Sequence, residues 1–167
     1  MKKNERELIR QLVIGSISEE DFLKSFTVNL VENSNYFKQL LESAYDEKDD
    51  DAVARLIYIG SVFNLFTEEH VQILCKLMES KWHEQHEDIA TIFEFLKSPK
   101  SIESLYKAAI TEFEYLDYDE NYALAVKCIW ALGQINTVQS RQKLELLSKS
   151  DNEIISKNAI KQLKCKA

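Results

Sequence analysis

Glycine and proline are scarce in this chain: its 167 residues include three glycines and one proline. Strand turns and long loops depend on both residue types, so a protein with so few of them is expected to be mostly helical. No run approaches the ~18 apolar residues that a membrane-spanning helix needs. The N-terminal sequence MKKNERELIRQL also lacks the apolar core of a secretory signal. These absences predict a soluble, cytoplasmic, helical protein.

Cysteine is sparse as well, and motifs of enzyme chemistry are missing. The three cysteines, Cys75, Cys128 and Cys165, lie far apart, and none belongs to a Cys-x-x-Cys motif. This pattern favours reduced thiols, two of them in apolar helical stretches. There is no glycine-rich phosphate loop, Gly-x-Ser-x-Gly motif or Cys–His nucleophile pattern. Carboxylate pairs suited to acid–base catalysis are plentiful, but none stands out. We therefore expect a protein that is not an enzyme and binds no cofactor.

The chain has an excess of acidic residues, and most of them lie in the middle of the sequence. The net charge is -7; residues 1–41 are neutral, residues 42–120 carry -12 and residues 121–167 carry +5. A middle this acidic repels phosphate backbones and attracts a basic protein, so we expect no nucleic-acid partner and no membrane partner. A solvated acidic face that only keeps the protein soluble would have the same composition.

Apolar residues recur at helical spacing along nearly the whole chain. Three segments align at offsets of 36 and 37 residues: DAVARLIYIG (51–60), DIATIFEFLK (88–97) and LAVKCIWALG (124–133). The matched positions are Ile57, Phe93 and Trp130, followed by Ile59, Phe95 and Leu132. Each segment is followed by a second apolar helix, and two helices per period of this length are typical of helical solenoids.

Short polar residues mark the expected helix starts. Three helices are expected to be capped by Ser18, Thr67 and Ser140, and a fourth by Asn33 or Ser34. The last acids of residues 46–51 are expected to lie at the N-terminus of a further helix, where negative charge is favoured. We expect one domain with about eight or nine helices. It would consist of N-terminal capping helices over residues 1–45, three helix-pair repeats over 46–150 and a C-terminal capping helix over 151–167.

The C-terminal part of the chain resembles a HEAT repeat. The sequence ALAVKCIWALGQINTVQSRQKLELLSKSDNEIISKNAIKQL (123–163) has an alanine-rich helix ending in Ala-Leu-Gly, a short turn, a Leu-x-Leu-Leu helix and an aspartate before the next helix. This resemblance implies an all-α, right-handed HEAT-like solenoid of antiparallel helix pairs. The concave face of such an array is a common docking surface.

The stretch KWHEQHED (81–88) contains the one candidate metal site. His83 and His86 are three residues apart, so on a helix they would share a face with nearby carboxylates and could hold a transition metal. The spacing is not His-Glu-x-x-His, and no third distant ligand is apparent. We favour the alternative, a polar turn that starts a helix at Asp88, and expect no metal.

A cluster of acids and tyrosines between two expected repeats is the main candidate binding site. Its members are Glu112, Glu114, Tyr115, Asp117, Tyr118, Asp119, Glu120 and Tyr122. Tyrosine offers contact area at low entropic cost, and acids steer a basic partner. Alternatively this is a solvated loop in which Tyr115 and Tyr122 fill the space beneath it, while Asp117, Asp119 and Glu120 stay in water. Further candidate contact residues are Glu84, Glu87, Asp88, Asp49 and Asp50.

This chain is small, acidic and HEAT-like, and it contains a WH-x-x-HED stretch and an NYALAVKCIWALG helix. In these features it resembles bacterial immunity proteins of polymorphic-toxin or contact-dependent inhibition systems. The resemblance implies a basic protein partner, the C-terminal domain of a cognate toxin, often a nuclease, whose active site is blocked. We expect a monomer apart from that complex. Two alternatives stay open: a general HEAT scaffold or adaptor without a toxin, and a HEAT-like DNA glycosylase, for which the acidic middle is unfavourable.

Overall fold

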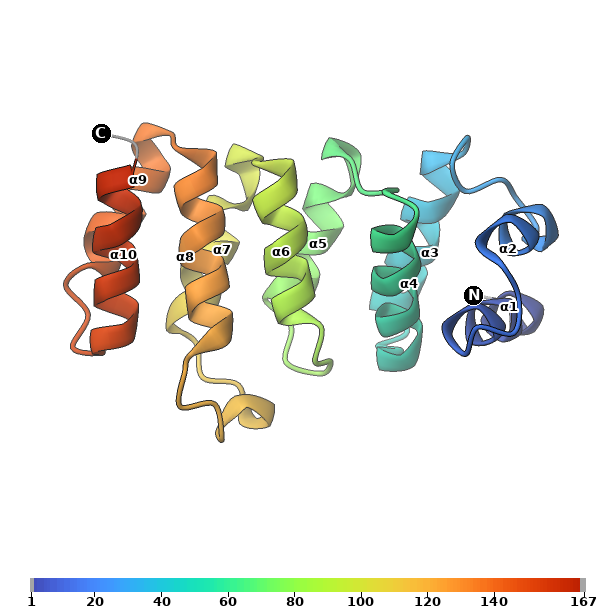
Figure 1. The fold of residues 1–167 in the computed structure, drawn as a ribbon, viewed down its shortest axis with the longest axis horizontal. Coiled ribbons are helices and arrows are strands. Elements are labelled where there is room, and N and C mark those ends of the chain that lie inside the picture. Colours follow the sequence, from blue (N-terminus) through green and yellow to red (C-terminus); the bar gives the residue numbers. More distant parts are fainter. Residues whose placement is uncertain (1, 166–167) are drawn as a thin grey trace. The chain divides into compact units, whose positions relative to one another are not determined.

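The computed structural model describes residues 2–165 and contains helices but no strand in that range (Figure 1). The expected all-α class is therefore confirmed. The described residues form ten α-helices rather than eight or nine. They are α1 (Lys3–Val13), α2 (Glu19–Ser25), α3 (Ser34–Asp46), α4 (Asp50–Val62), α5 (Val71–Met78), α6 (His86–Leu96), α7 (Ile102–Ile110), α8 (Ala123–Ile135), α9 (Val138–Leu147) and α10 (Glu153–Cys165). Three short 3-10 helices are Glu68–His70, Pro99–Ser101 and Glu114–Leu116.

The chain forms two compact units whose boundary lies between Phe66 and Thr67. The first unit contains α1 to α4 and the second contains α5 to α10. The last two residues of the expected C-terminal capping helix, 166 and 167, lie outside the described residues. None of the helices in residues 2–165 has the length and apolar character to cross a membrane.

Local side-chain caps set several helix starts. Ser18 accepts a hydrogen bond from the backbone N–H of Asp21, and Asn33 and Asp49 accept the equivalent bonds at the starts of α3 and α4. These caps satisfy backbone donors that a helix end leaves unpaired, as expected from the sequence. Two expected starts were wrong. Thr137, not Ser140, caps α9, and α6 begins at His86.

Aromatic rings fill the core of the first unit. Phe22 stacks on Phe63 with ring centroids 5.3 Å apart, and Phe37 meets Phe66 edge to face at 5.5 Å. Gly60 on α4 lies directly beneath this second pair. A Cβ atom there would be 2.5 Å from the Phe66 ring, so only glycine permits this approach.

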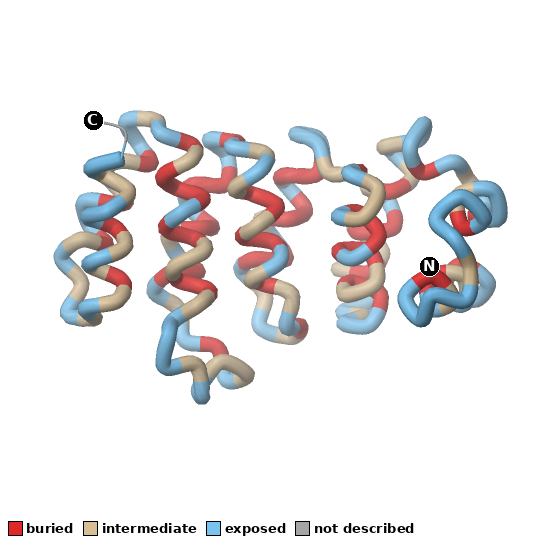
Figure 2. The backbone as a smooth tube through the Cα atoms, viewed as in Figure 1, coloured by how far each residue is buried: buried red, intermediate tan, exposed pale blue. Residues whose placement is uncertain are grey.

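Helix α8 is the centre of the second unit, since it packs against α6, α7, α9 and α10. Figure 1 shows α6, α8 and α10 side by side, and Figure 2 shows buried positions along α6 and α8. Because neighbours surround α8 on several sides, its buried residues spread around the helix. They are Leu124, Ala125, Cys128, Ile129, Ala131, Leu132, Gly133 and Ile135.

Residues that align in the three repeated segments differ in burial, so the alignment does not match equivalent positions in the structure. Phe93 is fully buried, but the aligned Trp130 is 41% exposed. Leu132 is fully buried, but the aligned Phe95 is 82% exposed. In α8 the apolar residues surround the helix, so the sequence alone does not indicate which of them faces a neighbour.

Candidate partner-binding surface

The acidic segment, residues 112–122, connects α7 to α8 and includes the 3-10 helix Glu114–Leu116. It contains all eight members of the acid and tyrosine cluster. The helices on either side of it bury their apolar faces in the core of the second unit. The segment is thus a loop presented by a packed scaffold, an arrangement that commonly carries binding.

Tyr115 anchors the acidic segment to the start of α6. Its hydroxyl lies 2.9 Å from Nδ1 of His86, and the buried ring of Phe113 lies 4.1 Å from the His86 ring, centroid to centroid. Burial raises the pKa of the Tyr115 hydroxyl, with further increases from Glu87 and Glu84. The expectation that Tyr115 packs beneath the loop is therefore confirmed.

His83 and His86 are structural groups. Nε2 of His83 lies 2.9 Å from the Leu77 carbonyl, while Nδ1 accepts the backbone N–H of Gln85. Nε2 of His86 lies 2.7 Å from the Ser80 carbonyl, and since a carbonyl only accepts, this nitrogen carries the proton. Nδ1 of His86 therefore accepts from Tyr115.

Burial holds His86 in its neutral form. It lowers the pKa of His86 to about 4, with His83 contributing in the same direction. The two rings are stacked 4.5 Å apart. Among residues 2–165, no group of three or more His, Cys, Asp or Glu side chains is arranged to hold a metal ion.

Asp119 has a structural role that the sequence did not reveal. One carboxylate oxygen accepts the backbone N–H of Ala123 at 2.6 Å, at the start of α8, and the other accepts that of Asn121 at 3.0 Å. Asp119 is partly buried, so the expectation that it stays in water was wrong. Tyr122 has a left-handed backbone (φ 52°) and is 45% exposed, so it does not fill the space beneath the segment as Tyr115 does.

The rest of the acidic segment faces solvent. Asp117 and Glu120 are exposed, as expected, and Tyr118 is 82% exposed. Glu112 and Glu114 are exposed too. Within residues 2–165, the ion pairs do not include any carboxylate of this segment. These side chains are available to a partner.

The structure brings residues 84–88 next to the acidic segment through the His86–Tyr115 contact. Glu84 and Asp88 are exposed, whereas Glu87 forms an ion pair of 3.0 Å with Lys127 on α8. Glu87 is therefore partly neutralised, and Glu84 and Asp88 remain as candidate contact residues.

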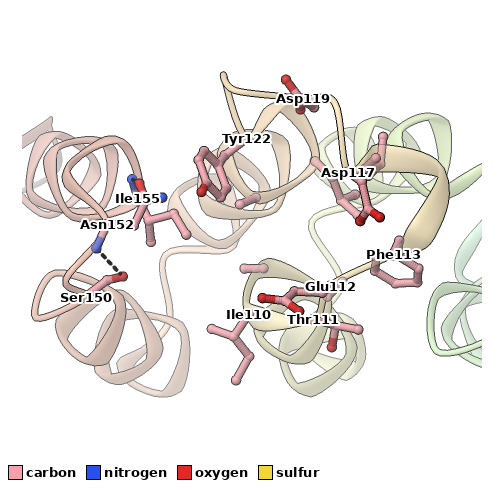
Figure 3. A pocket seen from close by; sticks show the side chains of 15 residues that line it. Ile110, Thr111, Glu112, Phe113, Asp117, Asp119, Tyr122, Ser150, Asn152 and Ile155 are labelled. Atoms are coloured by element: carbon pink, nitrogen blue, oxygen red, sulfur yellow. Dashed lines mark hydrogen bonds between the residues drawn. The ribbon is translucent and has the colours of Figure 1, made fainter.

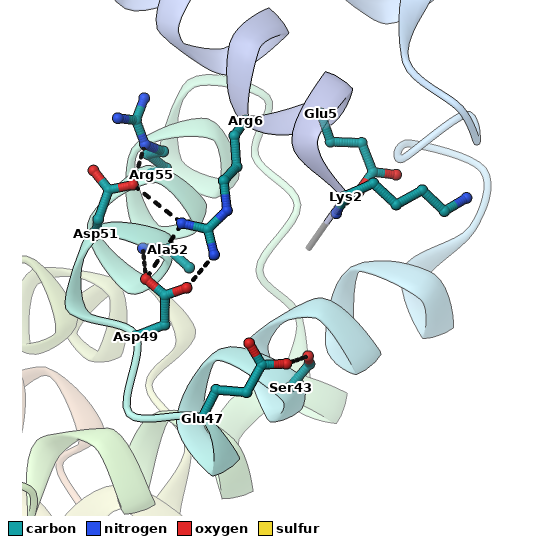
Figure 4. A network of polar contacts seen from close by, with 9 residues as sticks. All are labelled: Lys2, Glu5, Arg6, Ser43, Glu47, Asp49, Asp51, Ala52 and Arg55. Carbon is teal, nitrogen blue, oxygen red and sulfur yellow. Dashed lines mark hydrogen bonds and ion pairs between the residues drawn. The ribbon is translucent and has the colours of Figure 1, made fainter.

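Asp49 and Asp50 belong to the first unit, and the structure assigns Asp49 to the fold. Asp49 caps α4 and pairs with Arg6 of α1, which also contacts Asp51 (Figure 4). Its hydrogen bond to Arg6 lowers the pKa of Asp49. Asp50 is exposed. The partner Arg6 lies more than forty residues away in sequence, so local patterns gave no signal for this pair.

A groove of about 460 Å³ runs beside the acidic segment (Figure 3). Its walls come from three separated parts of the second unit, so no local stretch of the sequence indicates the groove. They are the end of α7, the acidic segment with the start of α8, and the connection from α9 into α10. The lining residues are Ala108, Ala109, Ile110, Thr111, Glu112, Phe113, Leu116, Asp117, Asp119, Tyr122, Leu124, Ala125, Ser150, Asn152 and Ile155.

Comparison of the chain with models of known protein families, with curated proteins and with solved structures found no match in any of the three. The resemblances to HEAT repeats and to immunity proteins therefore rest on the sequence motifs alone.

Proposed function

We propose that this protein is an immunity protein that binds the C-terminal domain of a cognate basic bacterial toxin, such as a nuclease, and blocks its active site. Binding, not catalysis, would be its activity. The carboxylates of the acidic segment would occupy the positions that nucleic-acid phosphates take in the toxin cleft. Charge complementarity of this kind speeds association and disfavours wrong partners.

One observation carries this proposal: the exposed carboxylates of the acidic segment form no ion pair within residues 2–165, yet the segment is attached to a packed scaffold. Asp117, Tyr118 and Glu120 face solvent, while Tyr115 and Asp119 tie the same segment to α6 and α8. A loop held in one conformation loses less entropy when it binds than a mobile loop does.

We also propose that the helices of the second unit form a right-handed HEAT-like solenoid. The successive packing of α6 on α8 and of α8 on α10, with α7 and α9 also against α8, supports it. A cytoplasmic location is part of the proposal. It is supported by three cysteines without a disulfide and by the absence of a membrane-spanning helix in residues 2–165.

The test is binding to the C-terminal domain encoded by the neighbouring upstream gene, measured by surface plasmon resonance, which gives both rate constants and affinity, at about 50 mM and about 300 mM NaCl. We expect tight association that weakens at the higher salt concentration. The variant Asp117→Lys/Glu120→Lys should lower the association rate constant, whereas Glu32→Lys/Glu145→Lys, with the same change in charge, should have little effect. Absence of binding would overturn the immunity role and leave a HEAT-like adaptor as the function to pursue.

A further inference from the structure

The groove beside the acidic segment is acidic, and a base outside its lining, Lys81, donates to the backbone carbonyl of Glu112 at 3.2 Å rather than to a carboxylate. Its lining includes the carboxylates of Glu112, Asp117 and Asp119, and no lysine or arginine. Asp119 is engaged by the backbone of α8. Glu112 and Asp117 form no ion pair within residues 2–165. Figure 3 shows both of these carboxylates beside the same open space.

Most of the other side chains that line the groove are apolar. The apolar lining residues are Ala108, Ala109, Ile110, Phe113, Leu116, Leu124, Ala125 and Ile155. The two polar side chains on the far wall are used locally: Ser150 accepts the backbone N–H of Asn152, and Asn152 accepts those of Ile154 and Ile155 at the start of α10. The groove therefore combines several apolar side chains with negative charge on one wall.

This combination matches one kind of side chain, a long aliphatic stem that ends in a cation. Two carboxylates on neighbouring stretches suit a planar guanidinium, which donates several hydrogen bonds in one plane. The exposed ring of Tyr122, also in the lining, adds a face on which a guanidinium can stack. A groove of about 460 Å³ also leaves room for the backbone that carries the side chain.

We propose that this groove receives an arginine side chain of the basic partner, with the stem along the apolar lining and the guanidinium between Glu112 and Asp117. This inference rests on the proposed function, and it adds the position and chemistry of the central contact. The other exposed acids of the segment then act at longer range, by steering.

The groove is tested without the toxin, by titrating ¹⁵N-labelled protein with acetyl-Gly-Arg-Gly-amide. The control peptide carries citrulline, which keeps the length and shape of arginine but has no charge. We expect the arginine peptide to shift the backbone amides of residues 108–117, 122–125 and 150–155. We expect the citrulline peptide to bind at least fivefold more weakly. Equal binding of the two peptides, or shifts spread over all acidic regions, would overturn the proposal.

Two double variants with the same change in charge distinguish binding in the groove from general electrostatic attraction to the acidic segment. Glu112→Gln/Asp117→Asn removes the groove carboxylates, and Glu114→Gln/Glu120→Gln removes two exposed carboxylates of the segment that do not line it. The first should weaken arginine-peptide binding at least fivefold, and the second less than twofold. An equal loss in both variants would show that only net charge matters.

The outcomes also separate this inference from the proposed function. If the arginine peptide binds in the groove but the toxin domain does not bind, the immunity role fails and the groove remains. If the toxin domain binds equally well to the wild type and to Glu112→Gln/Asp117→Asn, the immunity role remains and the groove proposal fails.

Discussion

The hydroxyl of Tyr115 donates a hydrogen bond to Nδ1 of His86 across 2.9 Å, and this contact links the acidic segment to α6. The opposite nitrogen of His86 is committed to the carbonyl of Ser80, so the imidazole has one tautomer and one orientation. A buried imidazole whose two nitrogens both form hydrogen bonds is held rigidly in place.

Replacing Tyr115 with phenylalanine should destabilise the protein by about 1–3 kcal/mol, because it leaves a buried imidazole nitrogen without its donor. The change is measured as the free energy of unfolding in urea. Tyr118→Phe is the matched control: its hydroxyl is exposed, so stability should change by less than about 0.5 kcal/mol. Equal stability of the two variants would mean that the Tyr115–His86 contact contributes nothing.

Protonation of His86 should make the fold less stable in acid. Because its pKa is about 4 in the folded state and about 6.5 when unfolded, the unfolded chain binds more protons between these values. The His86 contribution is therefore fully present above pH 6.5 and is lost as the pH falls towards 4. Its slope is at most about 1.4 kcal/mol per pH unit.

The measurement is urea unfolding of the wild type and of His86→Gln at several pH values between 7.5 and about 4.5. Carboxylates such as Glu7, whose pKa Arg10 lowers to about 2, contribute equally to both proteins and cancel in the difference. The stability difference between the two proteins should shrink as the pH falls. A constant difference would contradict the assignment of a depressed pKa to His86.

Three helix starts were predictable from local sequence, whereas the starts expected at Ser140 and Asp88 were wrong. The caps by Ser18, Asn33 and Asp49 involve residues three positions apart, so a short stretch of sequence contains both partners. The helix count was less predictable, because marginal segments depend on packing for their stability.

Tertiary features of the site were not predictable in the same way. The acidic cluster was visible as a composition, but the groove needs a wall from residues 150–155, which only folding brings near. The positions of Trp130 and Phe95 on α8 and α6 show the same limit, since an apolar residue on a helix packed on several sides has no unique inward direction.

Asp119 and Asp117 are predicted to respond differently to the same substitution. Asp119→Ala should cost about 1 kcal/mol of stability, because it removes the acceptor for backbone donors at the start of α8. Asp117→Ala should change stability by less than about 0.5 kcal/mol, because its side chain is exposed. Thermal unfolding of both variants tests this. If Asp119→Ala is as stable as Asp117→Ala, the capping role of Asp119 is wrong.

The two helical glycines provide a final matched pair. Gly60→Ala would place a methyl group 2.5 Å from the Phe66 ring and 2.8 Å from the Phe37 ring. These rings belong to the packed core of the first unit, so the substitution should cost about 1–3 kcal/mol.

Gly133→Ala instead meets the amide end of the Gln162 side chain, which can rotate away. Alanine favours a helix over glycine by about 1 kcal/mol, so this variant should be as stable as the wild type or more stable. Urea unfolding of the two variants gives the comparison. A destabilised Gly133→Ala together with an unaffected Gly60→Ala would contradict the close packing of α4 against Phe66, and with it the reason why glycine occupies position 60.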